Sequence, residues 1–164
     1  MAKRLRPAIS ASHTIWMKAI HIPTSKVIGI AGWAKESSPV HNVWRRSAAD
    51  HYDWKSSEGW TNAELEEIWK HVDVEVWEKQ FGGADEIREA FLKGKEHWYL
   101  APLITWPDWQ GRGVGRYLLD EGLERAEKEG LPIYLESEDT ARAVYLRMGF
   151  KAVGKVNMIW TPRN

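Results

Sequence analysis

A chain of 164 residues is long enough for one domain and can bury about 70% of the surface that it exposes when unfolded. Its 23 basic and 23 acidic residues cancel, which argues against the basic surface typical of nucleic-acid-binding proteins. The absence of cysteine excludes disulfides, thiolate nucleophiles and cysteine-based metal sites. Because no apolar run approaches the ~20 residues needed to cross a bilayer, we expect a cytoplasmic protein that does not bind membranes.

The chain begins with a predicted arm and a predicted hairpin. Residues 1–12 show no periodic pattern and are expected to form an arm. The runs 13–22 and 26–34 are rich in isoleucine, tryptophan and valine, and Pro23-Thr24-Ser25 separates them. This pattern predicts a β-hairpin over residues 13–35.

Residues 36–97 form a tryptophan-rich segment for which we expect irregular chain with short helical pieces. Thr61-x-x-Glu64 has the form of a capping box, and apolar residues follow it at helical spacing up to Val76. Gly82-Gly83 is predicted to end this helix, and residues 84–93 are predicted to form a second one. We interpret the tryptophans as core anchors; a recognition surface for an apolar partner or substrate is the alternative.

Strands and helices alternate in the rest of the chain, which predicts a mixed α/β sheet. The central strand, 98–106, contains Pro102, which requires a bulge, a break or an edge position because proline cannot donate to a β-ladder. The next helix is predicted to turn one face to the sheet: Gly115, Leu118, Leu119, Gly122, Leu123 and Ala126. A short buried strand over 133–136, a helix capped by Asp139 or Thr140 and running to Met148, and a strand or hairpin over 150–160 follow.

A glycine-rich segment, Trp109-Gln110-Gly111-Arg112-Gly113-Val114-Gly115-Arg116, joins the central strand to the helix after it. Glycine lets a backbone approach a ligand closely, and the first amides of a helix attract anions. The segment therefore predicts a phosphate-binding corner, with a plain β-to-α turn as the alternative. It lacks the Gly-Lys-Ser/Thr ending of a Walker A loop and the third glycine of a Rossmann fingerprint, so we do not expect dinucleotide binding.

Gln110, Gly113 and Gly115 fill the pattern Gln/Arg-x-x-Gly-x-Gly/Ala, which resembles the acetyl-CoA pyrophosphate loop of the GNAT superfamily of N-acetyltransferases. Residues 134–137 and 143–150 resemble the strand and the helix end that follow in that family, at matching spacing. The resemblance is closest to the fungal branch. It implies a single GNAT-like domain of the acyl-CoA N-acyltransferase fold (α/β, with an α+β mixed sheet), splayed at the central strand and flanked by helices, with residues 98–164 as its acetyl-CoA-binding core.

The resemblance also implies that acetyl-CoA is the co-substrate, and the histidines show no metal-ligand spacing. The residues expected to hold the co-substrate are Leu103, Ile104, Thr105, Gln110, Gly111, Arg112, Gly113, Val114, Gly115, Arg116 and Arg142. A backbone amide of the central strand would polarise the thioester carbonyl. The three arginines could pair with the pyrophosphate, or they could be solvated charges.

Tyr145 and Glu136 are the expected catalytic residues. The resemblance implies that the Tyr145 hydroxyl points at the co-substrate sulfur, and a phenol of pKa ~10 can share a proton with a thiol of ~8.5. Packing against the sheet is the alternative role for Tyr145. Glu136, on the strand that faces the splay, is the candidate base for the amine, directly or through water, and pairing with an arginine is its alternative.

Together these features predict an acetyl-CoA-dependent N-acetyltransferase that acetylates a primary amine of a small molecule or a peptide by direct attack in a ternary complex. Only about a dozen residues precede the first hairpin, where family members usually have a strand and two helices that wall the acceptor site. Residues 36–94 could replace them, the acceptor side could be open, or a partner subunit in a homodimer could complete the site. The alternative function is a non-catalytic CoA-binding or protein-interaction module that retains the scaffold.

Overall fold

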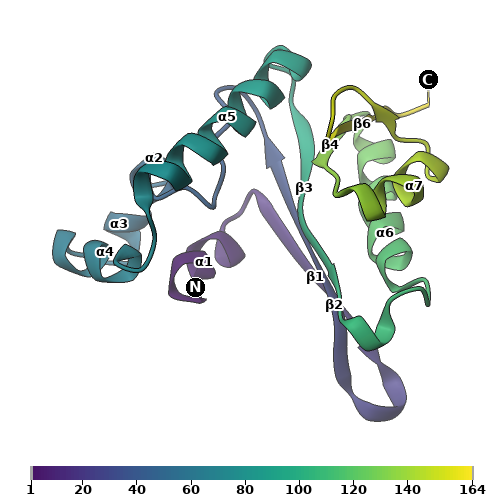
Figure 1. Ribbon diagram of the computed structural model, residues 1–164, viewed down its shortest axis with the longest axis horizontal. Coiled ribbons are helices and arrows are strands. Elements are labelled where there is room, and N and C mark those ends of the chain that lie inside the picture. The colour runs from purple at the N-terminus through teal and green to yellow at the C-terminus, as the bar shows by residue number, and fades with distance from the viewer. Residues whose placement is uncertain (1, 164) are drawn as a thin grey trace. The chain divides into compact units, whose positions relative to one another are not determined.

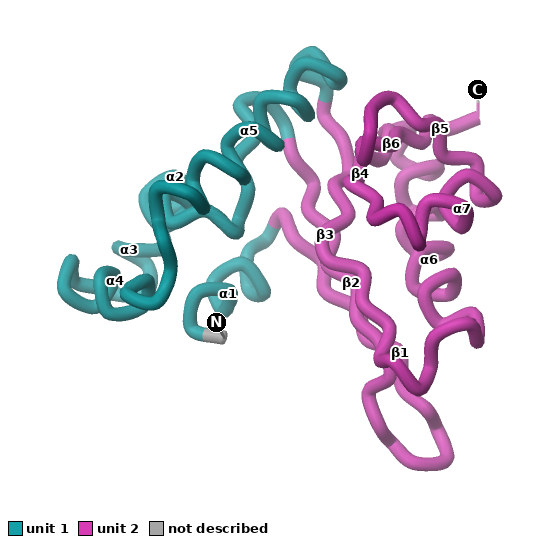
Figure 2. The backbone as a smooth tube through the Cα atoms, in the orientation of Figure 1, with its two compact units in different colours: residues 1–12, 37–95 teal, residues 13–36, 96–164 magenta. Residues whose placement is uncertain are grey.

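The computed structural model describes residues 2–163, which group into two compact units (Figure 2). The sheet unit consists of residues 13–36 and those from 96 onward. The helical unit consists of the residues up to 12 and residues 37–95. The expectation of a single domain stays a prediction.

The sheet unit is a mixed sheet with two helices, and this confirms the predicted fold class (Figure 1). Within residues 2–163 the strand order is β1-β2-β3-β4-β6-β5, and β3 and β4 form its parallel pair. The strands are β1 (Thr14–His21), β2 (Lys26–Glu36), β3 (His97–Thr105), β4 (Ile133–Glu136), β5 (Lys151–Ala152) and β6 (Asn157–Trp160). The helices are α6 (Val114–Glu129) and α7 (Asp139–Arg147), and short 3₁₀ turns are η1 (Ile22–Thr24) and η2 (Pro107–Trp109).

The predicted hairpin and the predicted disturbance at Pro102 are both confirmed. β1 and β2 pair antiparallel, and Ser25 closes their turn with a φ of 54°. Pro102 lies inside the sheet, and the register of β2 against β3 shifts between Ala31 and Trp33, next to it. This irregularity lets an interior strand accommodate a residue that cannot donate to the ladder.

β3 and β4 separate soon after they pair. Trp98 pairs with Ile133 and Tyr99 with Tyr134, and the described residues show no pairing of these strands beyond them. The sheet is therefore open on the β4 side of β3, as the expected splay requires.

Helix α6 lies close against the sheet because Gly122 has no side chain. A Cβ built at Gly122 would lie 2.1 Å from Cζ2 of the buried Trp33. The predicted apolar face is turned inward, since Leu118, Leu119 and Ala126 are buried. Gly130 ends the helix in the left-handed conformation with a φ of 68°.

Helix α7 begins one residue earlier than its predicted caps suggest. Its N-cap is Glu138, whose carbonyl accepts from the amide of Ala141 at 3.0 Å and from that of Arg142 at 3.1 Å. The caps predicted at Asp139 and Thr140 are wrong because the extended backbone of Glu138 (φ −63°, ψ 149°) already supplies the first helical acceptor. Beyond the helix, Gly149 (φ 91°) leads into the β5–β6 hairpin.

In the helical unit, the predicted N-terminal arm is wrong, because residues Ala2–Ser10 form helix α1. Tertiary contacts explain it, since an isolated helix of this length is unstable in water. Ala8 is fully buried in a cluster that includes Trp54, Trp60 and Trp69. The guanidinium of Arg4 lies 4.6 Å from the centre of the Trp69 ring, and its Nε donates to the carbonyl of Ile68 at 3.0 Å.

The short helices expected in the tryptophan-rich segment are confirmed as α2 (Ala48–His51) and α3 (Trp54–Ser57). The capping box at Thr61 is also confirmed and begins α4 (Asn62–Trp69). The predicted continuation to Val76 is wrong, because the carboxylate of Asp73 accepts from the amide of Val76 at 3.1 Å and begins a new helix, α5 (Val74–Leu92).

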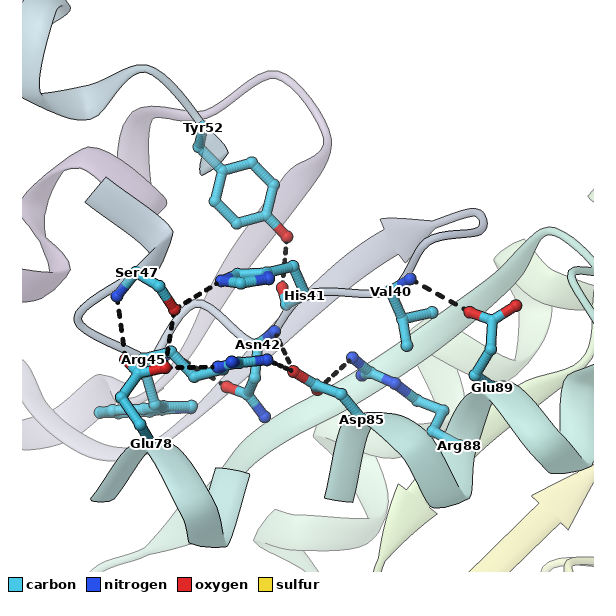
Figure 3. A network of polar contacts seen from close by, with 11 residues as sticks. Val40, His41, Asn42, Arg45, Ser47, Tyr52, Glu78, Asp85, Arg88 and Glu89 are labelled. Carbon is cyan, nitrogen blue, oxygen red and sulfur yellow. Dashed lines mark hydrogen bonds and ion pairs between the residues drawn. The ribbon is translucent and has the colours of Figure 1, made fainter. Parts of the chain in front are cut away.

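Helix α5 runs through Gly82-Gly83, where a helix end was predicted. Two glycines cost a helix about 1 kcal/mol each, and a polar network offsets this cost. Arg45 donates to Glu78 at 2.9 Å and to Asp85 at 3.1 Å, and thereby holds the segment before α2 against α5 (Figure 3). A Cβ built at Gly82 would lie 3.4 Å from Cζ of Arg45, so the glycine leaves room for this guanidinium.

Candidate functional site

A groove of about 1860 Å³ lies between α6 and α7 and reaches the end of β3, entirely within the sheet unit. It is larger than the ~300–1,000 Å³ of typical enclosed ligand pockets and is therefore an open groove. Of the residues expected to act on acetyl-CoA, it brings together Leu103, Thr105, Gln110, Gly111, Gly113, Val114, Gly115, Arg116 and Tyr145.

The glycine-rich loop has the conformation of an anion site. Gly111 and Gly113 have φ values of 71° and 82°, and a Cβ built at either would have no described atom within 4 Å. The first hydrogen bond of α6 runs from the amide of Tyr117 to the carbonyl of Gly113 at 3.0 Å. The helical amides before Tyr117 therefore have no acceptor inside the helix and are available to an anionic ligand.

The three arginines occupy different positions. Arg112 does not line the groove: it is exposed beside it, with its guanidinium carbon 5.2 Å from the centre of the Trp109 ring. Arg116 is also exposed and lies 3.6 Å from the carboxylate of Asp120. Arg142 does not line the groove: it donates to the carbonyls of Lys155 at 2.6 Å and Gly154 at 3.1 Å, which holds the β5–β6 turn.

β3 presents both side chains and amides to the groove. Leu103 and Thr105 line it, whereas Ile104 points to the opposite face and is 44% exposed. The amide of Trp106 donates to the carbonyl of Ile28 on β2 at 3.0 Å. Because antiparallel pairing alternates along a strand, the amides of Leu103 and Thr105 point away from β2, toward the opening between β3 and β4.

Tyr145 lines the groove from α7 and is 7% exposed. Its ring packs edge-on against Phe150, with ring centres 5.5 Å apart. Among residues 2–163 the Tyr145 hydroxyl has no hydrogen-bond partner, so it is available to a ligand. Burial raises the pKa of Tyr145, which keeps the phenol protonated and able to donate.

Glu136 lies apart from the groove. It ends β4, and its Oε2 accepts a hydrogen bond from the hydroxyl of Tyr99 at 2.9 Å. The neighbouring residue Leu135 belongs to the core that also contains Tyr145. Because side chains alternate along a strand, Glu136 faces the other side of the sheet, and the structure does not bring it together with Tyr145.

Sequence reasoning missed several groove residues that a helical period could have identified. Ala141, Val144 and Met148 line the groove together with Tyr145, at spacings of one α-helical face. Leu119 and Leu123 line it from α6, where they were expected as core residues.

The part of the chain that the structure describes contains neither a cluster of metal ligands nor a membrane-spanning helix. No three histidine, aspartate or glutamate side chains gather there as ligands for a metal ion. No helix over residues 2–163 is both long and apolar enough to cross a membrane.

Comparison with known proteins agrees with this geometry. Residues 56–158, more than half of the chain, match the model of the acetyltransferase (GNAT) domain. A Corynebacterium glutamicum structure described as histone acetyltransferase HPA2 and related acetyltransferase shares 20% identity, over 99% of this chain and 76% of that chain, at a TM-score of 0.54.

Two further solved structures share the fold at lower identity. A transcriptional regulator from Bacillus halodurans is 13% identical over 94% of this chain and 70% of that chain, with a TM-score of 0.53. A Trypanosoma brucei acetyltransferase is 15% identical over the same shares, with a TM-score of 0.50. Closeness to the fungal branch stays a prediction. The domain match, on a chain with this fold and this groove, shows that the protein belongs to the GNAT acetyltransferase domain family, a membership that supports acetyl transfer from acetyl-CoA.

Proposed function

We propose that the protein is an N-acetyltransferase that transfers the acetyl group of acetyl-CoA to a primary amine of a small molecule or a peptide, by direct attack in a ternary complex. One observation carries the proposal. The glycine loop and Tyr145, which are far apart in the sequence, line a single groove beside the open edge of β3. Acetyl-CoA requires a phosphate site for its diphosphate and a proton donor, such as a protonated phenol, for the thiolate that leaves.

The diphosphate of acetyl-CoA would bind at the start of α6. The amides of Val114, Gly115 and Arg116 would donate to its oxygens, and Arg112 would supply a cation at the outer edge. A Cβ at Gly111 or Gly113 would meet no described atom within 4 Å, and the phosphates would occupy this open space. The arm that carries the thioester would extend along β3, where the amides of Leu103 and Thr105 face the opening.

In the reaction the neutral amine attacks the carbonyl carbon of the thioester, the new C–N bond forms and the C–S bond breaks. An amide of β3 would stabilise the negative charge that develops on the carbonyl oxygen. Tyr145 would donate its proton to the departing thiolate and recover one from solvent. Positioning both reactants contributes up to ~7–11 kcal/mol, more than any single side chain.

We propose that Glu136 removes the proton of the amine, directly or through water. Glu136 ends β4, which borders the opening beside β3, and an acceptor that enters from the face opposite Tyr145 would lie on the same side of the sheet as its carboxylate. A cytoplasmic location and the choice between a small-molecule and a peptide acceptor stay predictions.

Calorimetric titration with acetyl-CoA, with NAD and ATP as controls, tests the first half of the proposal. Gly113→Glu should abolish binding, because it adds a carboxylate and a side chain at a φ of 82°. Gly113→Ala is the matched control that adds the backbone strain without the charge. Unchanged affinity in Gly113→Glu would remove the loop from the site.

Release of free CoA in the presence of a panel of amines tests the second half. Because the protein has no cysteine, a thiol reagent detects the product without background from the enzyme. Amine-dependent thiol release supports the proposal. Binding of acetyl-CoA without transfer to any amine or peptide would instead identify a non-catalytic CoA-binding module.

A further inference from the structure

The turn between β1 and β2 contacts the phosphate loop through His21. The imidazole of His21 lies 4.5 Å from the ring of Trp109, centre to centre, with the two planes at 49°. A hydrogen bond between Nδ1 of His21 and Oγ1 of Thr24, at 2.8 Å, fixes this imidazole within its own turn. Trp109 in turn lies 5.2 Å from the guanidinium carbon of Arg112. Three side chains, His21, Trp109 and Arg112, therefore form a continuous contact from the hairpin to the loop.

Trp109 stands at the start of the glycine loop and packs against the core of the sheet unit. It precedes Gln110 and lines the groove, and its amide donates to the carbonyl of Trp106 at 2.8 Å. On its inner side the loop is held by Gln110, whose Nε2 donates to the carbonyl of Thr105 at 3.2 Å. Gly111 and Gly113 add no side-chain contact. Two contacts therefore hold the Trp109 ring at the start of the loop: the core of the sheet unit and the imidazole of His21.

The orientation of the Arg112 guanidinium depends on the Trp109 ring, whereas that of Arg116 does not. Within residues 2–163 no carboxylate pairs with Arg112, whereas Arg116 lies 3.6 Å from Asp120. The contact that orients the Arg112 guanidinium is thus the Trp109 ring, and a cation held over an indole keeps its N–H donors available to an anion.

We infer that His21 is a positioning residue for the phosphate loop, so that the β1–β2 turn forms part of the co-substrate site. His21 holds Trp109, Trp109 orients Arg112, and Arg112 meets the diphosphate. This inference rests on the proposed function, because it assumes that the loop binds acetyl-CoA. It adds a residue outside the glycine motif, on a different element, to the set that determines co-substrate affinity.

Three variants test the inference. His21→Ala removes the ring, His21→Phe keeps an aromatic ring without the hydrogen bond to Thr24, and Ile22→Ala changes a neighbouring side chain that is 87% exposed. An aromatic contact of this kind corresponds to a change of roughly three- to tenfold in affinity. We expect His21→Ala to raise the dissociation constant and the KM for acetyl-CoA by this factor, with kcat and melting temperature unchanged.

The two companion variants separate positioning from general stability. His21→Phe should restore affinity to within about twofold of the wild type, because the ring contact is retained. Ile22→Ala should match the wild type. Wild-type affinity in His21→Ala would overturn the inference. A loss of affinity that accompanies a lowered melting temperature, and that His21→Phe does not restore, would also overturn it. Failure of the wild-type protein to bind acetyl-CoA would instead overturn the proposed function, and this inference with it.

Discussion

Substitution of Gly122 by alanine would test how helix α6 is held against the sheet. A Cβ at this position would lie 2.1 Å from Cζ2 and 2.3 Å from Cη2 of Trp33, whose side chain is 2% exposed. Carbon atoms in contact normally lie ~3.5–4.0 Å apart. Either the helix or the indole must therefore move by roughly 1 Å or more, and the indole is enclosed in the core.

Two opposing effects determine how far Gly122→Ala changes the free energy of unfolding. Overpacking a core costs about 1–3 kcal/mol, and the upper end applies because the atoms that Cβ meets belong to a rigid, enclosed ring. Alanine is better than glycine in a helix by about 1 kcal/mol. We therefore expect Gly122→Ala to lower the free energy of unfolding by about 2 kcal/mol.

Urea denaturation followed by circular dichroism measures this change. Gly83→Ala is the matched control, because Gly83 lies in the middle of α5 and a Cβ there would have no described atom within 4 Å. This control should be as stable as the wild type or more so, by up to about 1 kcal/mol. Stability equal to the wild type in Gly122→Ala would refute the reasoning. Trp33→Leu combined with Gly122→Ala should cost less than the two changes added together, because the smaller side chain makes room for Cβ.

Three further predictions concern catalysis, pH and helix capping. Tyr145→Phe should lower kcat by roughly 10²-fold while the KM for acetyl-CoA stays within about twofold, because the hydroxyl acts in the reaction and not in binding; full activity in steady-state assays would assign the acid role to water or to another residue. Burial, followed by the charges of His51 and Arg45, lowers the pKa of His41 to about 4, so the unfolded chain takes up a proton near pH 6.5 and the folded protein does not. The free energy of unfolding should therefore fall as the pH decreases from 6.5 toward 4, and His41→Gln should flatten this fall between pH 6.5 and 5 in urea titrations. The wild type and His41→Gln both contain Glu78 and Asp85, so the difference between their stability curves against pH isolates the contribution of His41. Parallel stability curves for the two proteins would contradict the prediction. Asp73→Ala should cost about 0.5–2 kcal/mol by removing the cap of α5, and Asp73→Asn, which retains an oxygen acceptor, should recover most of it; equal stability of both variants and the wild type would show that the cap is unimportant.

Local patterns in the sequence predicted much of the sheet unit. The alternation of strands and helices, the turn at Pro23-Thr24-Ser25 and the stop at Gly130 depend on neighbouring residues, and all three are present. Pro102 predicted a disturbed central strand because the missing amide is a property of the residue itself. The glycine loop was recognised for the same reason, since left-handed φ values at Gly111 and Gly113 belong to that residue type.

Two errors arose where a distant contact decided the local structure, whereas the starts of α5 and α7 were missed at the local caps Asp73 and Glu138. Residues Ala2–Ser10 became a helix because Arg4 and Ala8 meet tryptophans that lie far along the chain. Helix α5 continued through Gly82 because Arg45 pairs with the residues on either side of it. Intrinsic helix propensity contributes little to whether a helix forms, and a few tertiary contacts outweigh it.

The amino-acid sequence by itself determined the order of the strands and helices in the sheet unit, the glycine-rich loop and the family, because each depends on the types of residues at short spacing. The tertiary structure alone decided which side chains share a groove. It brought Tyr145 to the loop, left Arg142 on a hairpin turn and set Glu136 on the opposite face of the sheet. It also brought His21 into contact with Trp109 from a strand far earlier in the chain. Spacing along a chain gives no distance between separate elements, and that distance arises when packing against a common core fixes the direction of every side chain.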